Sequence, residues 1–237
     1  MSKLISNAEF YALEFRKVNG LGDRLPIDFN SLLLNLNILT LFRPLSSDFS
    51  GMCLKDPMSD SLFMLINSNN SKGRQHFTIA HELYHLFFDD EFTPHKCNPG
   101  EGSTTASEKS ADAFAAALLM PQTGLSEFVR KSEDGPILAT VLKLEQYYSV
   151  SRAALLLRLQ QLRFINRSKQ DKLSQYPVIE TALEYGYDTA LYNSANEGLV
   201  IGDYGEVARG LFDKEKISEG HYLELLNKIK KSNNNGK

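Results

Sequence analysis

The sequence is poor in cysteine and histidine and has no long hydrophobic run, and these shortages narrow what the protein can be. Its two cysteines, Cys53 and Cys97, stand far apart, which argues against a disulfide scaffold and predicts reduced thiols. No segment approaches the roughly 18 apolar residues that span a membrane. The first residues also lack the apolar region and cleavage site of a signal peptide. We therefore expect a cytoplasmic protein.

An excess of charge of one sign is also lacking. The chain has 26 Lys and Arg against 29 Asp and Glu, so its net charge is −3. This near balance argues against binding nucleic acid over the whole surface, although a local basic patch is compatible with it. With 42% hydrophobic residues among 237, the chain is long and apolar enough to bury a substantial core.

Two of the five histidines stand four residues apart, in His81-Glu82-Leu83-Tyr84-His85. On a helix, residues four apart lie one above the other, so both imidazoles can reach one metal ion. The carboxylate of Glu82 then lies beside the open position of the metal, where it can take a proton from water. The pattern indicates a zinc-dependent peptidase. The alternative is a solvated helix with surface His and Glu pairs, but the neighbouring residues 77–88 are too apolar for an exposed helix.

A catalytic zinc ion needs a third protein ligand, and Glu108 is the next candidate along the chain. It opens a helical pattern that ends at Pro121, and Asp112 lies on the same face one turn later. We predict that Glu108 binds the metal and that Asp112 accepts the free N–H of a metal-binding histidine. In the alternative, Glu108 is a first-turn carboxylate that interacts favourably with the helix dipole, and Asp112 is a plain surface charge.

These segments resemble the ImmA/IrrE family of metallo-endopeptidases. The resemblance runs from about residue 40 to 165 and lies in Arg74 to His85, in Glu108, and in Phe114 to Pro121. It implies a zincin-like fold, one Zn²⁺ held by His81, His85 and Glu108, and Glu82 as the general base. It also implies a substrate that is a helix-turn-helix repressor or antitoxin, often encoded nearby, in stress, mobile-element or toxin–antitoxin regulation.

One residue departs from the family pattern. Tyr84 stands where the family usually has glycine. Its bulk can narrow the cleft, and its phenol can help to hold the oxyanion of the reaction. The alternative is that Tyr84 is a packing residue.

Short strands are expected at 37–45, 50–55 and 61–67, ahead of the metal-binding helix. We therefore predict an α+β fold in which the edge of a small sheet aligns an extended peptide by main-chain pairing. The expected division is a zincin-like metallopeptidase domain at 1–135, a helix-turn-helix-like segment at 136–168 and a C-terminal accessory region at 169–237. The last residues of that region are expected to be disordered.

The loop at 93–102 contains His95 and Cys97 between the two expected metal helices. We expect a mobile, exposed loop that contacts substrate, with His95 as another candidate oxyanion donor. The alternative is a second metal site, or Cys97 as a fourth ligand that closes the catalytic one.

Residues 143–172 contain seven Lys or Arg against two acidic residues, and Ser151 is a plausible N-cap for a second short helix. This segment resembles a helix-turn-helix unit, so its basic residues can contact DNA phosphates or an acidic partner. The alternative is a helical hairpin packed against the catalytic domain. The corresponding rival function is a binding-type regulator, or a toxin component, whose zinc site is structural or vestigial.

Overall fold

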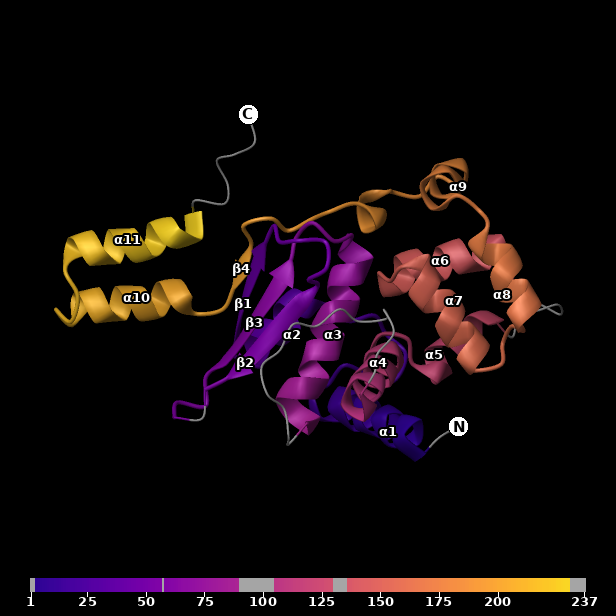
Figure 1. The fold of residues 1–237 in the computed structure, drawn as a ribbon, viewed down its shortest axis with the longest axis horizontal. Coiled ribbons are helices and arrows are strands. Elements are labelled where there is room, and N and C mark those ends of the chain that lie inside the picture. Colours follow the sequence, from indigo (N-terminus) through magenta and orange to yellow (C-terminus); the bar gives the residue numbers. More distant parts are fainter. Residues whose placement is uncertain (1–2, 57, 90–104, 130–135, 231–237) are drawn as a thin grey trace.

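The computed structural model describes residues 3–56, 58–89, 105–129 and 136–230, where a four-stranded sheet lies against helices (Figure 1). The predicted α+β class is confirmed. No helix in these ranges is long and apolar enough to cross a membrane. Along the chain the elements are α1 Lys3–Val18, α2 Phe29–Asn35, β1 Ile38–Arg43, β2 Gly51–Lys55, β3 Leu62–Asn67, α3 Lys72–Phe88, α4 Ala106–Leu119, α5 Gln122–Val129, α6 Leu138–Tyr148, α7 Arg152–Gln161, α8 Arg167–Ser174, α9 Val178–Glu184, the 3₁₀ turn η1 Ala190–Tyr192, β4 Val200–Ile201, α10 Tyr204–Asp213 and α11 Glu219–Lys230.

The sheet has the strand order β2-β3-β1-β4. β1 pairs with β3 in parallel, whereas β2 and β4 run antiparallel to their neighbours. All three predicted strands are found, and their side chains alternate between the two faces of the sheet. One face, which includes Ile38, Phe42, Met64 and Ile66, is fully buried in the core. The small sheet thus supplies one wall of the core.

Helix α3 packs against the buried face of the sheet, next to the edge strand β2. Its N-cap is Ser71, whose hydroxyl accepts a hydrogen bond from the backbone N–H of Arg74. A side chain at Gly51 of β2 would come within 2.5 Å of the Thr78 methyl group. The absence of a side chain at Gly51 therefore lets the edge strand lie directly on α3.

Helix α4 lies between α1 and α3 and ends where Pro121 was expected to stop it. Its N-cap is Thr105, which accepts a hydrogen bond from the backbone N–H of Glu108. At its other end, the buried guanidinium of Arg16 donates to the carbonyl of Leu118 and also to Gly22 in the loop after α1. This arginine ties α1 and its loop to α4, because backbone carbonyls buried in a core need donors.

Helices α6 and α7 are joined by three residues, with Ser149 in the left-handed conformation (φ 53°) and Ser151 as the N-cap of α7. The predicted pair of short helices is therefore confirmed. Two of the seven basic residues of the 143–172 segment point inward. Arg152 pairs with buried Glu145, and Arg158 pairs with Glu9. These ion pairs favour the alternative of a helical hairpin packed against the rest of the chain.

A segment near the C-terminus crosses the start of α3 and then joins the sheet as β4. The buried amide of Gln75 holds it in place: Nε2 donates to the carbonyl of Ala195 (2.8 Å), and Oε1 accepts from Asn196 (2.8 Å). The same Nε2 also donates to Asn70 in the turn before α3 (2.8 Å). Residues from the predicted accessory region thus complete the sheet that β1, β2 and β3 form. The predicted domain boundaries themselves stay a prediction.

We expect Gln75→Ala to lower the free energy of unfolding by about 2–4 kcal/mol, because it leaves several buried backbone and amide groups without a partner. Chemical denaturation followed by circular dichroism measures this loss. Gln161→Ala, at the exposed end of α7, is the matched control and should change stability by less than about 0.5 kcal/mol. Equal stability of both variants would show that the segment is not held through Gln75.

Candidate metal centre

Three side chains predicted as metal ligands lie together between α3 and α4. The Nε2 atoms of His81 and His85 are 3.2 Å apart, and each lies 3.2–3.3 Å from a different carboxylate oxygen of Glu108. All three ligand atoms fall within 4.8 Å of one another, so a single cation can reach them all. Within the described ranges, no fourth His, Cys, Asp or Glu joins this group.

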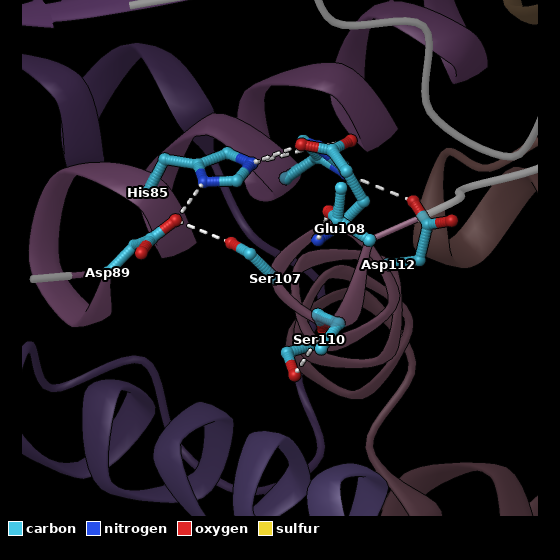
Figure 2. Close-up of polar contacts among 9 residues, drawn as sticks. His85, Asp89, Ser107, Glu108, Ser110 and Asp112 are labelled. Carbon is cyan, nitrogen blue, oxygen red and sulfur yellow. Dashed lines mark hydrogen bonds and ion pairs between the residues drawn. The ribbon is translucent and has the colours of Figure 1, made fainter. Parts of the chain in front are cut away.

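The local structure explains this convergence. His81 and His85 are one turn apart on the face of α3 that meets α4, and both are buried. Glu108 is in the first turn of α4, directly after the N-cap that fixes where this helix begins. Figure 2 shows the carboxylate of Glu108 reaching across to the imidazole of His85.

A carboxylate holds the other nitrogen of each imidazole. His81 Nδ1 lies 3.0 Å from Asp112 and His85 Nδ1 lies 2.9 Å from Asp89. Such contacts place the proton on Nδ1 and leave the lone pair of Nε2 for a metal. Asp112 lies where the sequence predicted, whereas Asp89 was missed. Its position four residues after His85 on the same helix was the signal that would have found it.

Asp89 also connects α3 and α4, the two helices that carry the cluster. It caps the C-terminal end of α3 and accepts a hydrogen bond from Ser107 in the first turn of α4. Figure 2 shows Ser107 pointing at Asp89, beside Glu108. This contact links the carboxylate that orients His85 to the helical turn that carries Glu108.

Glu82 is fully buried, and neither of its carboxylate oxygens has a hydrogen-bond partner among the described residues. An ionised carboxylate without a partner is costly inside a protein. A cation and its water at the neighbouring cluster would provide the missing interactions. The unpaired carboxylate and the donor set of two imidazoles and one carboxylate together fit a catalytic zinc site with one open position.

The carboxylates also change the protonation of the histidines. Burial by itself would lower the pKa of His81, but the hydrogen bonds that its imidazolium donates to Asp112 and Glu108, together with the charge of Glu82, outweigh it. The result is a pKa raised to about 9 in the metal-free protein. The site therefore has a negative potential that attracts positive charge, either a proton or a metal cation.

The remaining candidates from the sequence are Tyr84, His95 and Cys97. Tyr84 is buried against Phe88, Phe114 and His85, which favours the packing alternative over an oxyanion role. The pKa of its phenol is raised, chiefly by burial. His95 and Cys97 lie outside the described residues, so their predicted roles stay predictions.

We expect zinc affinity to rise about tenfold per pH unit between pH 7 and 9 and then to level off, because zinc must displace one proton from His81. Competition with a chelating dye across this range measures it, and an affinity that does not change with pH would contradict the assignment. In the metal-free protein, raising the pH has the opposite effect, and it acts on the stability of the fold. The proton on His81 stabilises the fold fully below pH 6.5, and this contribution is lost as the pH rises towards 9.

We also expect Asp89→Asn to weaken zinc binding by about 10- to 100-fold, the usual effect of removing the partner of a metal-binding histidine. Asp112→Asn should do the same through His81. Asp213→Asn, in an exposed ion pair of α10, is the matched control and should leave the affinity unchanged. Parent-like affinity in the Asp89 variant would mean that His85 is oriented by other contacts.

Comparison with known protein families shows which family the chain is similar to. The family model described as Peptidase M78, the IrrE N-terminal-like domain, matches residues 35–160. The match covers more than half of the chain and contains every residue of the cluster described above. No curated protein matches the chain. The chain therefore belongs to the ImmA/IrrE family of metallopeptidases.

Proposed function

We propose that this protein is a zinc-dependent endopeptidase that hydrolyses a peptide bond in a protein substrate. The observation that carries the proposal is the pairing of a three-donor cluster with a buried, unpartnered glutamate. A structural zinc site is closed by four protein ligands, whereas a catalytic site keeps one position open. Three donors within the described ranges favour the catalytic type.

In this mechanism His81, His85 and Glu108 would hold the ion, and Asp89 and Asp112 orient the two imidazoles. Bound zinc would supply the positive charge that acidifies a water molecule and polarises the scissile carbonyl. Glu82 takes the proton of the attacking water and delivers it to the leaving amine.

The sheet offers a way to align the substrate. β2 is an edge strand, and it lies on α3 through the contact of Gly51 with Thr78. An extended peptide that pairs with an edge strand gains main-chain hydrogen bonds without requiring a particular sequence. We propose that the substrate binds beside β2 and passes over the metal, in a zincin-like arrangement.

The family resemblance supports a regulatory substrate, a helix-turn-helix repressor or antitoxin in the cytoplasm. The rival function, DNA or partner binding through the 143–172 segment with a vestigial zinc site, has less support. Arg152 and Arg158 of α7 point inward, and the exposed positions of α7 are Ala153, Leu157 and Gln161. A DNA-reading helix presents several basic or amide side chains to the bases, and among these three positions only Gln161, at the end of α7, is of that kind.

We expect Glu82→Gln to keep one zinc ion per chain while hydrolysis falls by about 10²- to 10⁴-fold, because the variant cannot accept the water proton. The assay incubates zinc-loaded protein with a peptide library and with a helix-turn-helix protein encoded nearby, and maps cuts by mass spectrometry. Glu206→Gln, exposed on α10, is the matched control. Parent-like turnover by the Glu82 variant would remove Glu82 from the mechanism.

A further inference from the structure

The sheet has a second apolar face, which looks away from the core. In contrast to the buried face, its side chains are only half-buried, and none of them belongs to or packs on the core cluster. They are Leu39 and Leu41 of β1, Met52 and Leu54 of β2, Phe63 and Leu65 of β3, and Val200 of β4.

The register makes this outer face continuous across all four strands. Leu41 lies opposite both Leu65 and Val200, and Leu65 lies opposite Met52. The helices that pack extensively on strands in the described chain are α2 and α3. They share the inner side, because Phe29 of α2 meets His76 of α3 (ring centroids 5.2 Å apart). A sheet that is apolar on both faces needs a cover on each.

The α10–α11 hairpin also has an apolar stripe, and no residue of that stripe belongs to or packs on the core cluster of the described residues. The two helices contact each other, and Ala208 is their one buried residue among those with described side chains. Tyr204, Val207 and Leu211 follow the i, i+3, i+7 spacing of one helix face, and Val207 and Leu211 are 52% and 38% exposed. So small a hairpin buries too little surface to be stable by itself.

The hairpin is attached at the edge of the same sheet. It follows β4 after Gly202 and Asp203, and Gly202 adopts a φ of +130° that other residues rarely tolerate. Figure 1 shows α10 running away from the sheet, on the side opposite α3. Within the part of the chain that the structure describes, two apolar surfaces thus lie apart from the core, the outer face and the hairpin stripe, and the hairpin does not lie flat on its own sheet.

We propose that a second copy of this chain covers the outer face: in a symmetric homodimer, the α10–α11 hairpin of each copy packs on the outer face of the other. Such an exchange buries both apolar surfaces at once and closes with twofold symmetry.

The charges of the hairpin are compatible with this exchange. Residues 204–230 contain five acidic and five basic residues, and the pairs Arg209–Asp213 and Glu224–Lys228 neutralise one another within their helices. The hairpin therefore brings no net charge to the contact.

The remainder of the sequence offers no better cover. Residues 231–237, which follow α11, contain no apolar side chain. In the sequence, residues 90–104 stand between α3 and α4, the two helices that carry the metal cluster, and not next to a strand of the sheet. The neutral hairpin also lacks the charge that would select a strongly acidic or basic partner.

Light scattering and sedimentation of the full chain test the proposal. We expect twice the 26.7 kDa chain mass at micromolar concentration. Val207→Lys with Leu211→Lys should raise the dimer dissociation constant at least about a hundredfold, because both substitutions replace an apolar side chain in the contact by a charged one. Leu157→Lys, an exposed leucine of α7, is the matched control and should leave the dimer intact. Circular dichroism checks that each variant folds.

Mixing two variants tests the exchange itself. Leu41→Lys damages the outer face but keeps the hairpin stripe, and the double hairpin variant does the reverse. In the exchanged dimer their mixture keeps one intact contact, so we expect heterodimers where each variant alone is monomeric. A monomeric parent protein, a dimer that survives the hairpin substitutions, or a mixture that stays monomeric would each overturn the proposal.

Discussion

The packing of α3 against α4 creates the constraint on which the rest of this structure depends. It buries two imidazoles among the carboxylates of Glu82, Glu108 and Asp112, with Asp89 at the end of α3. Buried carboxylates are tolerated where a positive charge compensates them. In the absence of metal, the raised pKa of His81 shows that these carboxylates favour a positive charge beside them. A divalent cation compensates their charge more completely than a proton does.

Much of the surrounding fold serves to hold these two helices in place. The sheet buries one face of α3, α1 supports α4 through Arg16, and Gln75 ties the start of α3 to the segment that leads to β4. Asp89 and Ser107 join the helices at the metal centre itself. Rigid elements of this kind keep donor atoms in position before the ion arrives, which favours tight and selective binding.

Sequence patterns were sufficient where the information was local. The spacing of His81 and His85 on one helix, and of Glu108 and Asp112 on the next, predicted which side chains the structure brings together. The three strands before α3 were predicted from short stretches with strand-like composition, the third of them rich in Phe, Leu and Ile. Asp89 was missed, although its spacing of four residues from His85 was visible in the sequence.

The sequence was insufficient where the structure depends on the direction of a side chain or on pairing between residues far apart in the chain. A count of basic residues in 143–172 cannot tell that Arg152 and Arg158 point inward, because their partners Glu145 and Glu9 are identified only by the fold. The short helices α2, α5, α8 and α9 were not predicted, since each has eight residues or fewer and a weak periodic signal. The pairing of β4 with β1 joins residues about 160 positions apart, which no local pattern encodes.

X-ray absorption at the zinc edge of the zinc-loaded protein tests the central claim most directly, because it reports the atoms around the ion. For two imidazoles, one carboxylate and one water, we expect only nitrogen and oxygen neighbours at about 2.0–2.2 Å, with the scattering signature of two histidines. A sulfur neighbour at about 2.3 Å would mean that a cysteine closes the site, and would contradict a catalytic centre at His81, His85 and Glu108.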